Sequence, residues 1–389
     1  MERNIKNSIL SELKDSLNIY SKEEIRELII DRVLSGTRNL KLELKDKNKL
    51  INEIYDDICG YGLIEGFLKD PEVSEIMING GDNIFYEKNG NIWKLERAFE
   101  EKEQLENILQ TMVSKINRQV NQANPIVDVR LEDGSRVNIV VPPVAIDGPV
   151  ITIRKFRQEF LQMEDLLMED SLSPEAVDFL KELVEARYNL FVSGGTSSGK
   201  TTFLNLLAGF IPEEERLITI EDSAELKINH PNLVRLEMRN SNVEGLKDIS
   251  IRDLIKTSLR MRPDRIIVGE VRGGEAFDML TAMNTGHDGS MSTGHANSGE
   301  DMLLRLITMV VVGNNLKEEV AVNLIRSSID YIIHLSRYKG KRFLSGIYEI
   351  HKDERELKLK PIFIRGKENK LVKVGDISNR KKLDSHKKS

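Results

Sequence analysis

The chain contains 389 residues, more than one ordinary hydrophobic core supports, so its length predicts two or three domains. Hydrophobic residues make up 40% of the sequence and charged residues 31%, proportions that are typical of a globular protein. The formal net charge of −6 argues against a chain that binds nucleic acid through its overall charge. The single cysteine, Cys59, excludes an intrachain disulfide and a zinc site built from several cysteines.

Segments that would place the chain across a membrane are missing from the sequence. No apolar run approaches the roughly 18–20 residues that a membrane-spanning helix needs. The first residues, MERNIKNSIL, carry mixed charge and lack the apolar stretch of a signal peptide. We therefore expect a cytoplasmic protein, and docking on a membrane protein at the inner face stays open.

Residues 1–69 are expected to form an N-terminal helical region. Ser21 and Glu24 have the spacing of a capping box ahead of an apolar-periodic stretch, residues 25–34. A second helical pattern runs over about residues 44–59 and stops at Gly60.

Residues 70–156 predict an α+β domain. Two dipeptides that favour hairpin turns, Asn89-Gly90 and Asp133-Gly134, each lie between short runs with the composition of strands. A helical pattern over about residues 100–120 separates the two hairpins. The expected strands are 73–79, 83–86, 92–95, 127–131, 137–141 and 151–156.

The next stretch, residues 157–173, is polar and rich in glutamate, and we expect it to be a linker. In residues 174–364 strands and helices alternate, a pattern that predicts a parallel sheet covered by helices on both faces. The expected strands there are 190–193, 217–221 and 265–269, and the expected helices start at Lys200 and span 251–260.

The final stretch, residues 365–389, is a basic tail with nine Lys and Arg residues against three Asp and Glu residues. It shows little apolar periodicity. We therefore expect the chain from about Asp376 onward to be solvated or disordered.

A phosphate-binding loop is predicted at residues 194–201, GGTSSGKT, which fit the pattern G-x-x-x-x-G-K-[ST] between a strand and a helix. Glycines allow backbone N–H groups to turn toward a phosphate. Lys200 would bring a positive charge to the β- and γ-phosphates of ATP, and Thr201 would offer its hydroxyl to Mg²⁺. The expected nucleotide contacts are Gly194, Gly195, Thr196, Ser197, Ser198, Gly199, Lys200, Thr201 and Thr202.

Two predicted strands end in carboxylates. Glu221 closes the strand 217–221, with Asp222 next to it, and Glu270 follows the strand 265–269. In open α/β sheets the site lies at the carboxyl ends of the strands, so both glutamates are expected to face the nucleotide. One would orient or deprotonate the attacking water, and Glu270 would also help to hold the metal. The sequence leaves open which glutamate is the general base.

Two of the six histidines, His287 and His295, lie close together in the sequence. Their spacing fits no common zinc signature, and cysteine partners are missing. We expect both to lie in a polar loop beside the γ-phosphate, where they would sense its presence. A loop with a purely structural role stays open.

Arginines can neutralise charge that develops on a transferred phosphoryl group. Arg154 is the expected nucleotide contact, because it lies just before the linker. The other candidates are Arg130, Arg136, Arg252, Arg260, Arg262 and Arg272.

Together these motifs resemble the type II/type IV secretion-system ATPase superfamily, most closely the tight-adherence (Flp-type) pilus assembly ATPases of the CpaF kind. The resemblance covers about residues 60–350. Four boxes carry it in order: the Walker A box 194–201, the acidic box 220–225 (IEDSAE), the Walker B box 262–272 (RPDRIIVGEVR) and the histidine box 286–297 (GHDGSMSTGHAN).

The resemblance implies a RecA-like P-loop NTPase domain with a parallel sheet, preceded by an α+β (PAS-like) domain and the N-terminal helical region. It also implies a homohexamer that binds ATP and Mg²⁺ and works on an inner-membrane platform protein of a pilus or secretion system. Glu221 matches the family's proposed catalytic base, Glu270 its Walker B acid and His295 the histidine of its box. We therefore expect an ATP-hydrolysing motor for pilus assembly or protein secretion.

Two other functions stay open. A motor for DNA conjugation or DNA uptake would share the same chemistry. A non-hydrolysing switch that binds ATP only for assembly would not need its acids, yet Glu221 and Glu270 are both present. A helicase is disfavoured, because the net charge is negative and the sequence carries no strong signal for direct nucleic-acid binding.

Overall fold

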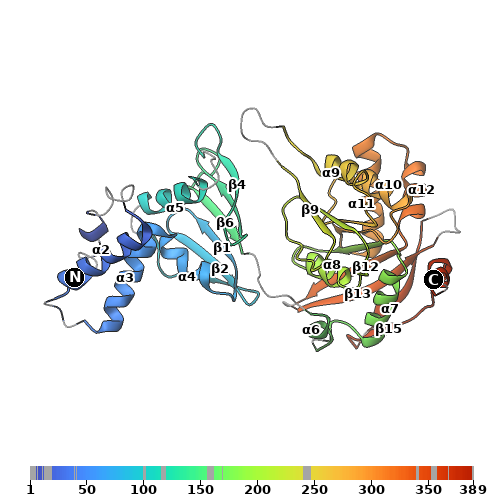
Figure 1. The fold of residues 1–389 in the computed structure, drawn as a ribbon, viewed down its shortest axis with the longest axis horizontal. Coiled ribbons are helices and arrows are strands. Elements are labelled where there is room, and N and C mark those ends of the chain that lie inside the picture. Colours follow the sequence, from blue (N-terminus) through green and yellow to red (C-terminus); the bar gives the residue numbers. More distant parts are fainter. Residues whose placement is uncertain are drawn as a thin grey trace. The chain divides into compact units, whose positions relative to one another are not determined.

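The computed structural model describes residues 6, 8–10, 12, 20–38, 40, 42–99, 102–114, 120–155, 162–168, 170–239, 247–338, 341–351, 357–366 and 368–387. The chain divides into two compact units, unit 1 over Met1–Glu159 and unit 2 over Phe160–Ser389 (Figure 1). Among the helices of the described ranges, none is both long enough and apolar enough to span a bilayer.

Helix α2 (Lys22–Gly36) begins at the predicted capping box. Ser21 Oγ accepts a hydrogen bond from the backbone N–H of Glu24 at 3.3 Å, and the Glu24 carboxylate accepts one from the Ser21 N–H at 2.7 Å. The buried residues of α2 repeat every four positions and belong to one hydrophobic cluster with those of α3 (Leu44–Cys59). Both predicted helices are confirmed.

A six-stranded sheet forms the rest of unit 1, with the order β3-β2-β1-β6-β5-β4 and every neighbouring pair antiparallel. Helix α5 (Lys102–Ser114) shares its hydrophobic core. The other elements are η2 (Gly62–Ile64), α4 (Glu65–Lys69), β1 (Val73–Asn79), β2 (Asn83–Lys88), β3 (Asn91–Lys94), β4 (Ile126–Arg130), β5 (Arg136–Val140) and β6 (Val150–Arg154).

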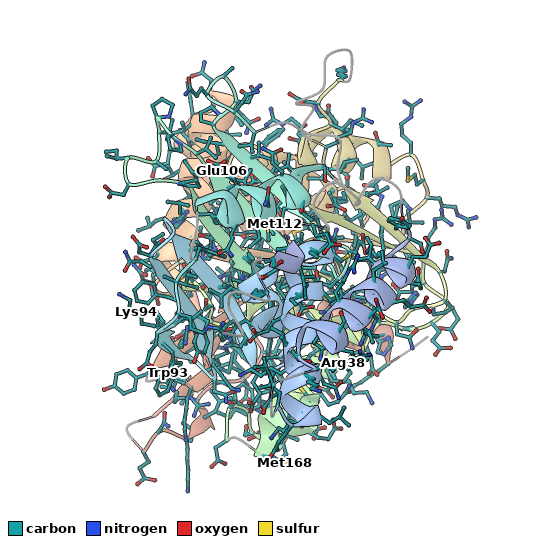
Figure 2. All side chains as sticks on the ribbon, turned by 90° about the vertical axis from the view of Figure 1, so that its left-hand side faces the viewer. Arg38, Trp93, Lys94, Glu106, Met112 and Met168 are labelled. Carbon is teal, nitrogen blue, oxygen red and sulfur yellow. The ribbon has the colours of Figure 1, made fainter. Side chains whose placement is uncertain are left out.

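The two predicted hairpins are confirmed in this sheet. Asn89 and Gly90 have φ values of 52° and 79° between β2 and β3, and Gly134 has a φ of 87° between β4 and β5. The edge strand β3 is exposed along its length, and Figure 2 shows Trp93 and Lys94 on it. Of the helix expected over 100–120, residues 100, 101 and 115–119 lie outside the described part of the chain.

Unit 2 is built on a nine-stranded sheet with the order β15-β14-β13-β12-β7-β11-β10-β8-β9. From β12 to β9 every neighbouring pair is parallel, and β13, β14 and β15 add an antiparallel extension. The strands are β7 (Leu190–Gly194), β8 (Leu217–Glu221), β9 (Leu233–Glu237), β10 (Arg265–Val268), β11 (Met291–His295), β12 (Tyr331–Tyr338), β13 (Lys341–Ile350), β14 (Leu359–Arg365) and β15 (Leu371–Lys373).

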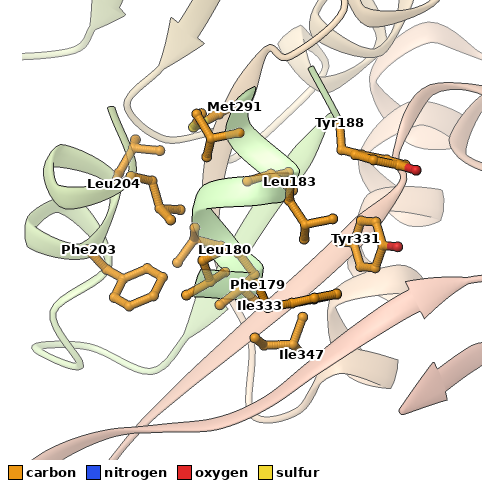
Figure 3. Packing of buried hydrophobic residues seen from close by; sticks show 14 of the residues in the cluster. Phe179, Leu180, Leu183, Tyr188, Phe203, Leu204, Met291, Tyr331, Ile333 and Ile347 are labelled. Carbon is orange, nitrogen blue, oxygen red and sulfur yellow. The ribbon is translucent and has the colours of Figure 1, made fainter. Parts of the chain in front are cut away.

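Two hydrophobic cores lie on opposite faces of this sheet, so the predicted α/β class is confirmed. In β7, Leu190 and Val192 belong to one core and Phe191 to the other, as the two-residue period of a strand requires. Figure 3 shows the first core, where α7 (Pro174–Glu185) and α8 (Lys200–Ala208) pack on the sheet. The helices of the second core are α9 (Ile251–Ser258), α10 (Glu275–Asn284), α11 (Gly299–Asn314) and α12 (Glu318–Ser328).

Part of the segment that we expected to be a linker is packed into unit 2. Helix α6 (Met163–Met168) lies within it, and both Met163 and Leu172 are buried in the first core. Residues 157–161 and 169 lie outside the described ranges.

The C-terminal residues differ from our expectation of a solvated or disordered tail. Helix α13 (Lys381–His386) is folded, and Leu383 is only 2% exposed within the first core. The Lys382 ammonium lies 2.9 Å from the carboxylate of buried Asp330, and the Glu349 carboxylate accepts from the backbone N–H of Ser378 at 2.9 Å. The sequence did not reveal this docking because the basic residues have their acidic partners elsewhere in the chain.

We expect Leu383→Ala to destabilise the protein by about 2–5 kcal/mol, because it removes a buried side chain and leaves a cavity. Leu304 on α11 is 63% exposed, so Leu304→Ala is the matched control and should change stability by no more than about 0.5 kcal/mol. Urea unfolding followed by circular dichroism measures both. Equal midpoints for the two variants would mean that the C-terminal segment is a solvated tail after all.

Candidate active site

The predicted motifs of unit 2 converge on one edge of its sheet. The adjacent parallel strands β7, β11, β10 and β8 have their carboxyl ends at this edge. Gly194 ends β7, His295 ends β11 directly opposite Gly194, and Glu221 ends β8, while Glu270 follows β10. The strand that carries His295 therefore lies between the phosphate loop and the two glutamates.

The phosphate loop has a backbone that its glycines make possible. A Cβ atom on Gly194 would lie 2.5 Å from the Leu335 carbonyl oxygen and 2.5 Å from Ser198 Oγ, so no larger residue fits there. Gly199 has a φ of 93° and immediately precedes α8, whose first turn begins at Lys200. Backbone N–H groups of a first helical turn have no partner within the helix, so they are donors for an anion.

Lys200 holds its charge almost out of solvent, since the residue is only 7% exposed. Its ammonium donates to the carbonyl oxygens of Gly194 at 3.1 Å and Gly195 at 2.8 Å, and lies 3.1 Å from His295 Nδ1. These acceptors hold the ammonium at the mouth of the loop.

His295 lies between Lys200 and Glu270, whose buried Oε1 accepts no hydrogen bond from the described residues. A lysine ammonium can only donate hydrogen bonds, so His295 Nδ1 is the acceptor and the ring proton lies on Nε2. That nitrogen is 3.1 Å from Glu270 Oε1. Burial lowers the pKa of His295 below its ordinary value, and the charge of Lys200 lowers it further, so the ring is neutral near pH 7.

Glu270 is also paired with an arginine. Arg272 lies 2.9 Å from Glu270 Oε2 and 3.4 Å from Asp222, and its side chain is 63% exposed. Arg272 is thus the one arginine among our candidates in the described part of unit 2 that contacts these acids. Arg252 instead forms an ion pair with Asp278 at 2.6 Å.

The remaining arginine candidates are divided between the two units. In unit 2, Arg260 and Arg262 are exposed. In unit 1, Arg130, Arg136 and Arg154 lie on strands β4, β5 and β6. The nucleotide contact expected of Arg154 stays a prediction.

Glu221 is buried, with only 3% of the residue exposed. Its Oε2 accepts from the backbone N–H groups of Glu225 and Leu226, both at 2.7 Å, whereas its buried Oε1 has no hydrogen-bond partner among the described residues. Burial raises the pKa of Glu221, and the two N–H donors oppose that shift in part. A carboxylate with a raised pKa is a stronger base than an ordinary one.

An apolar pocket lies beside the phosphate loop in unit 2. Ser198, Gly199, Thr202 and Arg342 are among the residues that line it. The Arg342 guanidinium donates a hydrogen bond from Nε to the Ser197 carbonyl at 3.1 Å. Sequence reasoning missed Arg342, because no motif marks it and β13 lies far along the chain. The apolar lining comes from Leu166, Leu172, Phe203, Leu206, Phe343 and Leu344.

The expectation of a polar loop that holds both histidines is wrong. Residues 291–295 form the buried central strand β11, and His287 precedes that strand at the opposite edge of the sheet. His287 Nδ1 lies 3.2 Å from the Ala282 carbonyl oxygen at the end of α10. Within the described residues, no group of three or more His, Cys, Asp or Glu side chains is placed to hold a metal ion.

Sequence comparison finds a protein family that matches most of this chain. Residues 59–352 match a family described as "Type II/IV secretion system protein". A putative conjugal transfer protein of Mycobacterium tuberculosis is 31% identical over 77% of this chain and 86% of its own length. The type IV secretion system protein VirB11 of Bartonella quintana is 31% identical over 73% of this chain and 90% of its own length.

Solved structures share the fold. The ATPase DotB of Yersinia pseudotuberculosis aligns with a TM-score of 0.53 and 21% identity over 75% of this chain and 79% of its own. The pilus retraction motor PilT, solved with bound ADP, aligns with a TM-score of 0.51 and 21% identity over 71% of this chain and 78% of its own. At these identities the likeness concerns the fold alone.

We expect Glu221→Gln to raise the thermal midpoint at pH 7 while it impairs turnover. The raised pKa means that the native carboxyl binds its proton more readily than the unfolded one, so the stability of the wild type falls as pH rises through the pKa values. The neutral amide avoids this penalty. The gain should shrink toward about pH 4, just below the ordinary pKa of glutamate, where most of the carboxyl is protonated in the unfolded state as well as in the native state.

Thermal unfolding of both proteins at the two pH values measures this effect. Glu214 is exposed, and Glu214→Gln is the control that should leave the midpoint unchanged at either pH. A pH-independent difference between Glu221→Gln and the wild type would show that the carboxyl is not held at a raised pKa.

Proposed function

The chain belongs to the type II/IV secretion system protein family, and from this membership we propose that it hydrolyses ATP to drive secretion or pilus assembly. The observation that carries the proposal is the convergence, at one sheet edge, of the phosphate loop with His295, Glu270 and Glu221. An anion site beside two carboxylates in different environments is what phosphoryl transfer to water requires.

ATP would bind with its β- and γ-phosphates against the loop of Gly194 to Thr201. The backbone N–H groups and the start of α8 favour negative charge there, and Lys200 would exchange its carbonyl acceptors for phosphate oxygens. Thr202, in the same turn of α8 as Thr201, would contact the α-phosphate of ATP. The apolar pocket beside Gly199, which Phe203 and Phe343 help to line, is our candidate for the site of the adenine.

Mg²⁺ fits the donors at this edge. The Thr201 hydroxyl and the Glu270 carboxylate are the oxygen ligands that this ion prefers. When bound, it would neutralise negative charge on the phosphate oxygens. Glu270, whose carboxylate oxygens lie 3.1 Å from His295 Nε2 and 2.9 Å from Arg272, would supply one of its oxygens to the ion.

Glu221 is our candidate for the general base. Its raised pKa suits it to take a proton from water, and its unpartnered Oε1 is the acceptor for that proton. The water oxygen would bond to the γ-phosphorus while the bond from that phosphorus to the bridging oxygen breaks. ADP then departs with the electron pair, and Lys200 and Arg272 neutralise the charge on the phosphate groups.

Hydrolysis would move a membrane-bound apparatus. The secretion-system names of the relatives support an inner-membrane platform protein as partner, and family membership supports a homohexamer at the cytoplasmic face of the membrane. A conjugation motor is the second candidate, because one relative is described as a putative conjugal transfer protein. The presence of both glutamates favours hydrolysis over an ATP-binding switch.

We expect Lys200→Ala to lose ATP hydrolysis, because the charge that holds the γ-phosphate is removed. Steady-state phosphate release measures this loss, and Lys181→Ala on the exposed face of α7 is the control that should keep wild-type turnover. Unchanged turnover in Lys200→Ala would refute the assignment of the phosphate loop.

We expect Glu270→Gln to keep ATP binding but lose turnover, because the amide cannot replace the charge that holds Mg²⁺ and water. Titration with a fluorescent ATP analogue measures binding, and phosphate release measures turnover. A variant that binds no nucleotide would contradict the separate roles that we give to the loop and to Glu270.

A further inference from the structure

A buried histidine next to the phosphate loop has no role in the reaction described above. His334 lies on β12 and is 6% exposed. In the parallel pairing of β12 with β7 it stands opposite Ser193, the residue before Gly194. The Ser193 hydroxyl is fully buried, and its oxygen lies 2.9 Å from His334 Nδ1.

The same ring also contacts the segment that leaves the histidine box. The main chain of Asn297, which follows His295 by two positions, lies beside the imidazole and acts to raise its pKa. Ala296, between them, donates its backbone N–H to the Gly194 carbonyl at 3.3 Å. The ring of His334 thus connects the strand that enters the phosphate loop with the chain that positions His295.

A neutral imidazole suits both contacts. It offers one donor and one acceptor, and a serine hydroxyl can serve in either sense, so the ring can bond Ser193 through Nδ1 and present its other nitrogen to the main chain of Asn297. Burial lowers the pKa of His334, which keeps the ring neutral. The charged groups that bear on it are Glu300 and Asp301 at the start of α11 and Lys200 on α8.

The backbone of β12 is irregular at this point. The pairing with β13 shifts between His334 and Leu335, which is the mark of a β-bulge. Bulges redirect side chains and occur next to functional sites. The carbonyl of Leu335 is also the backbone group that leaves no room for a side chain at Gly194. Two consecutive residues of β12 therefore shape the entry to the phosphate loop.

We propose that His334 is a positioning residue for ATP hydrolysis, which holds the segment after His295 against the strand that leads into the phosphate loop. The inference rests on the proposed function. Without this contact the His295 ring, which links Lys200 to Glu270, loses its fixed distance from the loop. Small displacements of this kind reduce turnover more than they reduce binding.

Steady-state ATP hydrolysis by the full chain tests the proposal with His334→Leu and His334→Gln. The leucine removes both polar contacts at similar volume, and we expect kcat to fall about tenfold with KM unchanged. The glutamine supplies one donor and one acceptor, so it should restore kcat to within about twofold of the wild type. His287→Leu, at the opposite edge of the sheet, is the matched control and should keep wild-type kcat.

Ser193→Ala removes the same Ser193–His334 contact from the other side, so it tests the proposal even if His334→Leu does not fold. It should lower kcat without a change in KM, and in a folded double variant with His334→Leu it should have no further effect. Wild-type kcat in both His334→Leu and Ser193→Ala would overturn the proposal. So would equal losses of kcat in His334→Leu and His334→Gln. A wild-type chain that hydrolyses no ATP would overturn the proposed function, and this inference with it.

Discussion

The charge of Lys200 is the constraint on which the candidate site depends. Lys200 is 7% exposed as a residue, and a buried ammonium is stable only if several acceptors surround it. Here two loop carbonyls and His295 are those acceptors. The loop carbonyls come close enough because Gly194 has no side chain. The histidine comes close enough because β11 lies directly beside β7, so His295 stands opposite Gly194. The position of one charge thus follows from strand order and from one missing Cβ atom.

Two glutamates at the same edge differ because their surroundings differ. Glu221 is buried, accepts two backbone N–H groups on one oxygen and has its pKa raised. Glu270 is more open, and its carboxylate lies 3.1 Å from His295 Nε2 and 2.9 Å from the Arg272 guanidinium. From this contrast we propose proton transfer for Glu221 and ion binding for Glu270, a choice that the sequence left open. The division of roles belongs to the proposed mechanism.

Much of the fold was readable from local patterns. The Ser21 capping box, the turn at Asn89-Gly90 and the strand–loop–helix around Lys200 depend on neighbouring residues, so short-range rules predicted them. The order of the strands depends on packing, so the sequence did not reveal that β11 separates β7 from β10. For the same reason Arg342 and the docking of Leu383 were missed, since each meets partners far away in the chain. His287 was misplaced because nearness in sequence does not reveal that a buried strand separates two histidines.

The central claim is that a nucleoside triphosphate binds at the carboxyl edge of the sheet in unit 2. A crystal structure with Mg²⁺ and a slowly hydrolysed ATP analogue tests it most directly. We predict that the β- and γ-phosphates lie against the backbone N–H groups of the loop, with the Lys200 ammonium on a phosphate oxygen instead of the Gly195 carbonyl. An analogue bound elsewhere, with Lys200 still on that carbonyl, would contradict the account.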